Sequence, residues 1–510
     1  MVHKLPVAEA AVCRPLCAFF KPGQKEEMAC GGFSLLTEAV PDPPTLARAL
    51  RAATPEDFAD RHHHLLHHAL CRRCPFFIDG CDFTDPQVSN DSPPCGGYMA
   101  IDMLLEQDSL DTAAVRDALL SPGLFVRLSG RCRIKHLEKP YLYQLDSDDM
   151  YELDADGLRL LKQCDGTRSL AELRPDPEFL EFCLGEGLLE ISEEQAPRDI
   201  GPVNPSPVPS LRYLELQLTR RCNIKCKHCY LGEAQNVELP FERALSLLRE
   251  FDEMQGLRVL ITGGEPMLYK HFKELNARLP EFGIRKVLLT NGMYLQEANY
   301  EHWSNFDEIQ ISVDGLERGH EAMRGAGTWA PTLRGVLAVK KMGMPLSIAT
   351  MVHPENLDEF EEMDRWIDEL DVMEWNIDQP TQAGRFPDHP ELWMKAEKAG
   401  SFLRYGRGGG YHSSGSDDAY GCGAHLSTVG PSGNILKCGY FPDSPYGRIH
   451  DSLQAAWDRA KPVILSELDC AACPHLMECH GGCRFRADGP KGVDPVMCKR
   501  FGVDPTSFNI

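Results

Sequence analysis

Three cysteines in the stretch LTRRCNIKCKHCYLG have the type and spacing of metal ligands. Cys222, Cys226 and Cys229 follow a C-x3-C-x2-C pattern, which brings three thiols onto one short loop. A four-iron cluster held by three protein thiolates keeps one iron open for another ligand. Structural zinc sites usually have four protein ligands, often from paired C-x2-C units. The spacing therefore favours an iron–sulfur cluster over zinc or a chance grouping.

Seven more cysteines follow residue 420 in a longer pattern. It reads C-x10-G-x4-C, a gap, C-x2-C-x5-C-x3-C, a second gap and a final C. Its members are Cys422, Cys438, Cys470, Cys473, Cys479, Cys483 and Cys498. In a reducing compartment, thiols at such short spacings are more often metal ligands than disulfides. The alternative is a zinc-ribbon-like fold without a redox function.

Polar turns follow three of the predicted strands. They are Thr262-Gly263-Gly264-Glu265-Pro266, Thr290-Asn291-Gly292 and Ser312-Val313-Asp314-Gly315. Glycine lets the backbone approach a ligand closely, and the Glu265 carboxylate suits a cationic amino group. Ligands of parallel α/β folds lie at the carboxyl ends of the strands. The turns therefore predict one ligand site beside the cysteine triad.

The triad and these turns together resemble the signature of the radical S-adenosylmethionine (SAM) superfamily. The resemblance implies that the triad holds a [4Fe–4S] cluster, and that SAM is cleaved reductively to methionine and a 5′-deoxyadenosyl radical. His320, Arg324 and Gly325 also fit a pattern common in this family. His228 stands where the family prefers an aromatic ring; it either packs against the adenine or faces solvent. The implied SAM-binding residues are His228, Gly263, Gly264, Glu265, Pro266, Asn291, Ser312 and Asp314.

The carboxy-terminal pattern resembles the SPASM extension of peptide-maturing radical SAM enzymes. The resemblance implies two auxiliary iron–sulfur clusters, the first held by Cys422, Cys438 and Cys483. The second is held by Cys470, Cys473, Cys479 and Cys498. The fourth position of the first cluster is either open or filled by another residue such as His425.

Six apolar runs alternate with segments of helical length between two linkers, 196–210 and 406–417. The runs are 213–218, 258–262, 286–290, 308–313, 345–350 and 372–377. This alternation predicts an α/β fold with a parallel sheet, as an open sheet or a partial barrel. The family resemblance favours a partial (β/α)6 barrel. The predicted domains are a cysteine-rich segment (1–125), a recognition domain (126–195), the barrel (208–400) and the auxiliary-cluster domain (415–510).

Composition narrows the class of protein. A chain of 510 residues is too long for one core, so several domains are expected. No apolar run is long enough to cross a bilayer, and the first residues lack the layout of a secretory signal. The net charge of −23 disfavours nucleic acid as the main partner. We therefore expect a cytoplasmic protein.

Residues 126–195 resemble the small domain related to the peptide chaperone of pyrroloquinoline-quinone biosynthesis, through LLKQCDGTRSLAEL and FLEFCLGEGLLE. That resemblance implies a leader peptide added to a sheet edge. The alternative is a winged-helix-like spacer. Cys164 and Cys183 stand at apolar helical positions, where core thiols are expected.

The first hundred residues hold another seven cysteines. Cys71, Cys74, Cys81 and Cys95 offer a four-ligand metal site, and Cys13, Cys17 and Cys30 offer three further thiols. The tract RHHHLLHHAL either binds metal, because i and i+4 histidines share a helix face, or forms a solvated helix face. Its histidines are His62, His63, His64, His67 and His68.

These features predict an oxygen-sensitive radical SAM/SPASM enzyme of anaerobic metabolism that modifies a ribosomally made peptide or small protein by crosslinking, oxidation or epimerisation. The alternatives are an enzyme acting on a haem precursor or another small molecule, a sulfatase-type protein maturase, and an iron–sulfur carrier without catalysis. The family usually takes electrons from ferredoxin or flavodoxin. No residue is singled out as a catalytic acid, base or radical relay.

Overall fold

The computed structural model describes residues 9–18, 30–40, 42–50, 54–55, 58–77, 81–84, 92–105, 110–120, 123–201, 203–408 and 419–508. The chain divides into two compact units. The first, Met1–Ile134 with Leu153–Pro202, is called the amino-terminal unit here. The second, Lys135–Glu152 with Val203–Ile510, is called the barrel unit.

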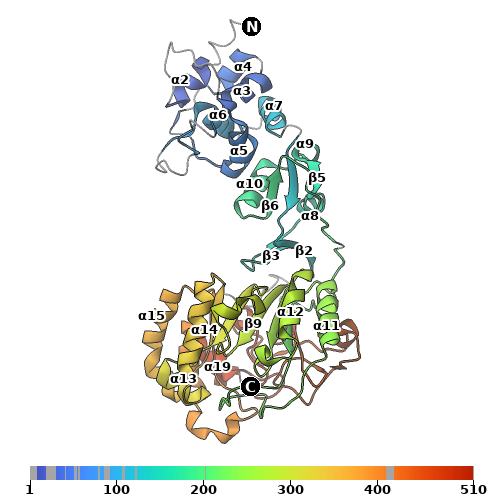
Figure 1. Cartoon of the computed structure of the whole chain (residues 1–510), viewed down its shortest axis with the longest axis vertical. Coiled ribbons are helices and arrows are strands. Elements are labelled where there is room, and N and C mark those ends of the chain that lie inside the picture. The colour runs from blue at the N-terminus through green and yellow to red at the C-terminus, as the bar shows by residue number, and fades with distance from the viewer. Residues whose placement is uncertain are drawn as a thin grey trace. The chain divides into compact units, whose positions relative to one another are not determined.

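The barrel unit is built on six parallel strands that neighbour one another in chain order (Figure 1). They are β7 (Tyr213–Gln217), β8 (Arg258–Thr262), β9 (Arg285–Thr290), β10 (Glu308–Ser312), β11 (Leu346–Met351) and β12 (Glu374–Asp378). All six predicted strands are confirmed, with ends shifted by two residues at most. Within the described strands β7 and β12 do not pair with each other, so the barrel is partial rather than closed.

Helices surround this sheet and bury its outer face (Figure 1). Helix α11 (Phe241–Glu253) shows why, since Ala244, Leu245, Leu248 and Phe251 recur at helical spacing and are fully buried. The other α-helices are α12 (Phe272–Arg278), α13 (Glu317–Arg324), α14 (Trp329–Lys341), α15 (Phe360–Leu370) and α16 (Ala396–Phe402). Short 3₁₀ helices are η3 (Pro266–Leu268), η4 (Leu279–Glu281), η5 (Glu297–His302), η6 (Pro354–Glu359), η7 (Phe386–Asp388), η8 (Pro390–Leu392) and η9 (Leu403–Tyr405).

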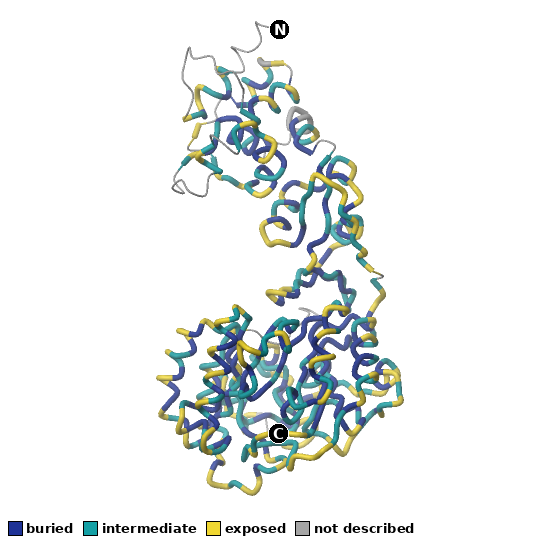
Figure 2. The backbone as a smooth tube through the Cα atoms, viewed as in Figure 1, coloured by how far each residue is buried: buried dark blue, intermediate teal, exposed yellow. Residues whose placement is uncertain are grey.

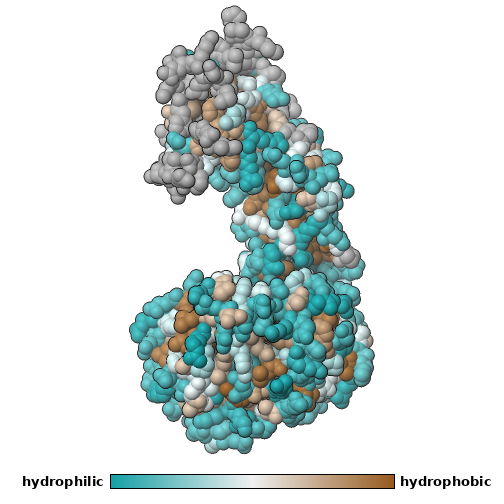
Figure 3. Space-filling view, viewed as in Figure 1, coloured by the Kyte–Doolittle hydropathy of each residue, from teal (hydrophilic) through white to brown (hydrophobic). Residues whose placement is uncertain are grey.

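Burial follows these layers. The strands are buried and the outer turns of the helices are exposed (Figure 2). The visible face of the barrel unit is mostly hydrophilic, with small separate hydrophobic patches (Figure 3). No helix in the described part of the chain combines the length and the apolar character needed to span a bilayer.

Four strands that the sequence did not predict extend the sheet to ten. β13 (Arg407–Gly408) pairs antiparallel with β12, and β14 (Leu426–Val429) pairs parallel with β7. β15 (Asn434–Leu436) and β16 (Gly447–Arg448) continue beyond β14, followed by α17 (Leu453–Trp457), η11 (Leu465–Glu467), α18 (Leu476–Cys479), α19 (Pro495–Arg500) and η12 (Pro505–Phe508). The segment that carries Cys422 and Cys438 is therefore anchored directly to the barrel sheet. Most of the glycine–serine linker predicted at 406–417 lies outside the described residues.

A hairpin of the predicted recognition domain belongs to the barrel unit instead. Its strands are β3 (Pro140–Gln144) and β4 (Met150–Glu152). The Glu138 carboxylate accepts hydrogen bonds from the backbone and hydroxyl of Ser210 and pairs with buried Arg212 at 2.7 Å. Tyr143 and Leu145 pack in one apolar cluster with Leu257. The predicted boundaries 126–195 therefore cut across the division in the structure, because residues 135–152 pack on the barrel.

The amino-terminal unit combines helices with a small antiparallel sheet of order β5-β1-β6. The strands are β1 (Phe125–Leu128), β5 (Asp165–Ser169) and β6 (Leu189–Ser192), while β2 (Cys132–His136) crosses the division between the units. The helices are α2 (Cys13–Leu16), α3 (Gly31–Ala39), α4 (Pro43–Ala49), α5 (His63–Ala69), η2 (Cys71–Arg73), α6 (Gly96–Leu105), α7 (Leu110–Leu119), α8 (Ala155–Leu161), α9 (Leu170–Leu173) and α10 (Pro177–Gly185). Cys183 is buried in α10 as predicted, whereas Cys164, also buried, lies just after α8 rather than within a helix.

Candidate functional site

The cysteine triad lies on the loop that leaves the carboxyl end of β7. The loop is tied to its surroundings by its backbone, since Lys227 N–H donates to the carbonyl of Met323 at 2.9 Å. Burial, with Asp314 and the thiols of Cys229 and Cys222, raises the pKa of the Cys226 thiol to about 12 against the opposing effect of Arg324. The three thiols therefore share one electrostatic environment.

A buried charge network adjoins this loop. Arg324 Nη1 lies 3.9 Å from the Cys226 Sγ, and Arg324 Nε lies 2.7 Å from Asp314 Oδ2. His228 Nε2 lies 3.9 Å from the same carboxylate oxygen. Although burial alone raises it, Arg324 and His228 hold the pKa of Asp314 down to about 2. Burial lowers the pKa of His228 to about 4. The arrangement places an arginine cation beside a triad thiol.

This donor set suits an iron–sulfur cluster. A cluster bound by thiolates carries negative charge, which the Arg324 cation offsets at Cys226. The buried His228 Nδ1 and His320 Nε2 have no hydrogen-bond partner among the described residues. Two buried ring nitrogens beside the triad loop are therefore available to a ligand. The described residues include no group of three or more His, Cys, Asp or Glu placed around a single metal ion. Thiolates of a four-iron cluster each bind a different iron, so they need not converge on one point.

The glycine turn after β8 packs directly on the triad loop. Gly264 N–H donates to the carbonyl of Thr219 at 2.7 Å, and Glu265 N–H donates to that of Arg221 at 2.8 Å. A Cβ at Gly263 would lie 2.4 Å from the Thr219 carbonyl oxygen, and one at Gly264 would lie 2.3 Å from that of Arg221. Both distances are too short for any side chain. Pro266 then begins η3.

We therefore expect Gly264→Ala to displace the triad loop. The added methyl group has no room, and such overpacking typically costs about 1–3 kcal/mol. Bound iron after anaerobic reconstitution, and SAM cleavage with it, are expected to fall. Gly130→Ala is the matched control, because a Cβ at Gly130 would meet nothing within 4 Å. Wild-type iron content in Gly264→Ala would contradict the required close approach.

Glu265 and Asn291 join the strand ends to each other. The Glu265 carboxylate is fully buried and accepts hydrogen bonds from the Thr290 hydroxyl at 2.8 Å and from the Asn291 backbone N–H at 3.0 Å. The Asn291 amide donates to the Asn223 side chain of the triad loop at 2.8 Å. These side chains thus link β8, β9 and the triad loop.

Asp314 and its neighbours hold the end of β10. Ser312 is the last residue of that strand. The Oδ1 of Asp314 accepts a hydrogen bond from the backbone N–H of Met351 at 2.7 Å. The backbone carbonyl of Asp314 accepts one from the side-chain amide of Asn356 at 2.9 Å. His320 Nδ1 faces the Asp314 backbone N–H at 3.4 Å. Gly325 ends α13 with a positive φ of 110°.

Cys422, Cys438 and Cys483 come together in the carboxy-terminal region. A hydrogen bond from Cys483 lowers the pKa of Cys422 to about 6. Burial, followed by Glu215 and Cys483, raises the pKa of Cys438 to about 11. The Nδ1 of His425 lies 2.8 Å from the Ser210 carbonyl oxygen, so this side of the ring faces the linker before β7.

Cys470, Cys473, Cys479 and Cys498 line one small cavity with Asp494, Met497 and Phe501. Burial, followed by the nearby Cys470, Asp494, Cys479 and Cys473, raises the pKa of Cys498 to about 11. The two sets of cysteines predicted for separate auxiliary clusters are thus two separate groups in the fold.

A tyrosine pair connects the triad loop with the first carboxy-terminal group. Tyr230 follows Cys229 directly, and its ring centroid lies 5.0 Å from that of Tyr440. The Tyr230 hydroxyl donates to Glu215 on β7 at 2.9 Å. Burial and Glu215 raise the pKa of Tyr230 well above its usual value. Sequence reasoning missed this contact, because only the pairing of β14 with β7 brings the two segments together.

In the amino-terminal unit, a cysteine of the predicted three-thiol set lies beside the predicted four-ligand set. A hydrogen bond from Cys95 lowers the pKa of Cys30 to about 6. Gly31 N–H lies 3.2 Å from the Cys74 Sγ, and Cys81 and Cys74 raise the pKa of Cys71 beyond the effect of its burial. Cys30 therefore joins the group predicted from Cys71, Cys74, Cys81 and Cys95.

The histidine tract forms α5 and the residue before it, and its side chains divide among several partners. His62 Nδ1 lies 2.9 Å from Asp102, His63 Nδ1 lies 3.0 Å from Asp60, and His64 Nδ1 lies 2.7 Å from Glu181. Burial lowers the pKa of His68 to about 4 and that of His67 below its usual value. This distribution favours structural contacts over one shared metal ion.

The sequence is similar to known proteins in the region that contains the triad loop and the strand-end turns. Residues 216–367 match the family model of the Radical SAM superfamily. The AdoMet-dependent heme synthase of Oleidesulfovibrio alaskensis is 30% identical over 184 residues, which are 35% of this chain and 47% of that protein. The PqqA peptide cyclase of Granulibacter bethesdensis is 30% identical over 154 residues, 29% of this chain and 41% of that protein. The chain thus spans about half the length of these relatives or less.

Structural similarity covers a larger part of the chain than sequence similarity does. SuiB of Streptococcus suis, solved bound to the precursor peptide SuiA, aligns with a TM-score of 0.53 at 15% identity. The alignment covers 74% of this chain and 99% of SuiB. This likeness shows a shared fold. The match to the Radical SAM superfamily therefore lies in residues 216–367, and 74% of the chain shares the fold of SuiB.

Proposed function

We propose that the chain is a radical SAM/SPASM maturase that modifies a ribosomally made peptide or small protein. The observation that carries the proposal is the combination of the triad loop with two separate carboxy-terminal thiol groups on one extended sheet. A [4Fe–4S] cluster with bound SAM supplies a 5′-deoxyadenosyl radical, which abstracts hydrogen from the substrate. Crosslinking, oxidation and epimerisation all begin with that abstraction.

The strand-end residues bind and orient the cofactors in this proposal. Cys222, Cys226 and Cys229 hold the cluster, and the turn at Glu265 receives the methionine amine of SAM. Arg324 offsets the negative charge beside Cys226, and Asp314 fixes Arg324 through the 2.7 Å ion pair. Asn291 and Ser312 donate hydrogen bonds to the ribose of SAM in this proposal. The His228 ring packs beside the adenine.

The carboxy-terminal groups hold two auxiliary clusters in this proposal. Cys422, Cys438 and Cys483 bind the first, whose fourth ligand stays unassigned, and Cys470, Cys473, Cys479 and Cys498 bind the second. Clusters held by these cysteines would supply an acceptor for the electron left after a crosslink, or a ligand position for the substrate. A ferredoxin or flavodoxin is the proposed reductant, and the amino-terminal cysteines form a candidate site for a further metal.

The small sheet of the amino-terminal unit is the proposed leader-peptide site. β6 lies at one edge of the order β5-β1-β6, and within the described strands it pairs with β1 alone. An edge strand accepts an added peptide strand through its free backbone groups. SuiB, which shares the fold, was solved with its precursor peptide bound.

A haem precursor is the second candidate substrate. The observation that favours it is sequence identity, since AdoMet-dependent heme synthases and a pre-heme d1 synthase are among the relatives of this domain. These matches cover half of each relative or less.

Anaerobic 5′-deoxyadenosine production distinguishes the candidates. The reconstituted full chain is incubated with SAM and dithionite, with and without small peptides encoded beside its gene, or with an iron porphyrin. We expect one peptide to stimulate SAM cleavage and to lose the mass of two hydrogens, or to keep its mass if epimerised. Stimulation by the porphyrin alone would transfer the assignment to small-molecule chemistry.

A further inference from the structure

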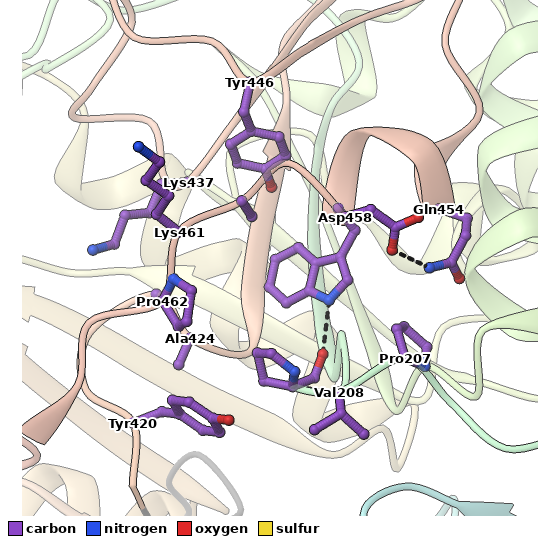
Figure 4. A pocket seen from close by; sticks show the side chains of 14 residues that line it. Pro207, Val208, Tyr420, Ala424, Lys437, Tyr446, Gln454, Asp458, Lys461 and Pro462 are labelled. Atoms are coloured by element: carbon purple, nitrogen blue, oxygen red, sulfur yellow. Dashed lines mark hydrogen bonds between the residues drawn. The ribbon is translucent and has the colours of Figure 1, made fainter.

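A pocket of about 460 Å³ opens in the barrel unit between the linker before β7 and the carboxy-terminal region (Figure 4). We propose that it binds a carboxylate-bearing segment of a peptide that also carries an aromatic or large apolar side chain. The proposal concerns a site apart from the strand ends, and it does not depend on SAM cleavage.

Aromatic side chains form the middle of this pocket. Trp457 and Tyr446 both line it, with their ring centroids 6.4 Å apart. Tyr420 lies below Tyr446 in the view (Figure 4). The Trp457 indole donates to the Pro209 carbonyl at 2.7 Å, and the Tyr446 hydroxyl donates to Ser427 at 2.6 Å. Because these hydrogen bonds fix both rings, the aromatic wall is formed before any ligand arrives.

Charge is separated across the pocket. Lys437 and Lys461 lie at one side, and Asp458 with Gln454 lies at the other (Figure 4). The Gln454 amide donates to the Asp458 carboxylate at 2.7 Å. Neither lysine forms an ion pair with a carboxylate among residues 203–408 and 419–508, and the negative groups that act most strongly on the charge of Lys437 are the thiols of Cys422 and Cys438. In a chain of net charge −23, two lysine ammonium groups that lie beside an aromatic wall without a carboxylate partner in these ranges favour an anionic ligand.

Lys437 also adjoins the first carboxy-terminal thiol group. Its stem covers Gly423, where a Cβ would lie 2.5 Å from the Lys437 Cε. A carboxylate bound at this ammonium is therefore held next to the cysteines of that group.

Apolar side chains at the rim favour a peptide over a small free carboxylate. Val208 lines the pocket and is 70% exposed. Ile464, which is 37% exposed, pairs through its backbone with Tyr420 and lies two residues beyond Pro462 of the lining. These exposed side chains continue the contact surface outside the cavity, where only a longer ligand reaches.

The test is a calorimetric titration of the full chain with two blocked tripeptides, acetyl-Glu-Phe-Glu-amide and acetyl-Gln-Phe-Gln-amide. We expect the acidic peptide to bind about tenfold more tightly at low salt, with the preference shrinking as salt screens the charges. Lys437→Met and Lys461→Met should each weaken the acidic peptide about three- to tenfold and leave the amide peptide unchanged. Lys398→Met, on the exposed surface of α16, is the matched control and should change neither.

Equal affinity for the two peptides, or no binding of either, would overturn the proposal, as would an equal loss in Lys398→Met. Acetyl-phenylalanine binding as tightly as the acidic tripeptide would overturn the peptide assignment. Lys461→Met keeps the test decisive if Lys437→Met fails to fold, because Lys461 is an exposed lining residue that is not adjacent in the chain to any cysteine of the thiol group. The titration contains neither SAM nor reductant, so its failure and a failure of the maturase proposal are separate results.

Discussion

Cys226→Ala is expected to abolish reductive SAM cleavage, whereas Cys473→Ala should retain a measurable part of it. Cys226 lies on the triad loop beside Arg324, while Cys473 lines the separate cavity with Cys470, Cys479 and Cys498. Removing one of three thiolates leaves the catalytic cluster with too few protein ligands. Both variants should lose iron, about four atoms per chain for each cluster that fails to assemble. The measurements are 5′-deoxyadenosine production and bound iron after anaerobic reconstitution.

Circular dichroism of both variants supplies the folding control. Complete and equal loss of SAM cleavage in two well-folded variants would contradict the separation of catalytic and auxiliary thiols. Retained cleavage in Cys226→Ala would remove this cysteine from the catalytic set.

Asp314→Asn is expected to lower the free energy of unfolding of the barrel unit by about 3–5 kcal/mol, the usual cost of breaking a buried ion pair. Asparagine keeps the size of the side chain and an oxygen for the Met351 N–H, so the change isolates the lost charge. Arg324 would then be a buried cation without its carboxylate partner. Urea unfolding followed by tryptophan fluorescence measures the difference.

The difference between wild type and variant should also depend on pH. The pKa of Asp314 is about 2 in the folded chain against an ordinary value of 3.8. A carboxylate with a depressed pKa stabilises the fold above the unfolded pKa, and this stabilisation is lost as pH falls through the folded pKa. We therefore expect a constant difference from pH 5 to 8 that shrinks as pH falls from about 4 towards 2.

Glu281→Gln is the control for that prediction. Glu281 pairs with Arg278 on the exposed surface, so its loss should leave the unfolding midpoint unchanged. Equal midpoints for Asp314→Asn and wild type would show that the buried pair adds nothing to stability.

Much of the barrel could be predicted from local patterns. The strands 213–218 and 258–262 were visible as short apolar runs, since a strand covered on both faces needs apolar residues throughout. The turns at Gly264 and Asn291 could be placed at strand ends because each follows such a run directly. By contrast, β14 was missed because its four residues, Leu426–Val429, are too short and too polar to form a distinct run.

The division of the carboxy-terminal cysteines into two candidate groups was implied by the family resemblance. The sequence by itself determined the spacing of the triad and the chain order of the parallel strands. These depend on neighbours in the chain, and local composition encodes them. Only the tertiary structure decided the rest: Arg324 beside Cys226, Tyr230 against Tyr440, and the hairpin 135–152 packed on the barrel. Each of these contacts joins segments far apart in the chain, and burial and charge compensation select such pairs only after the sheet has assembled.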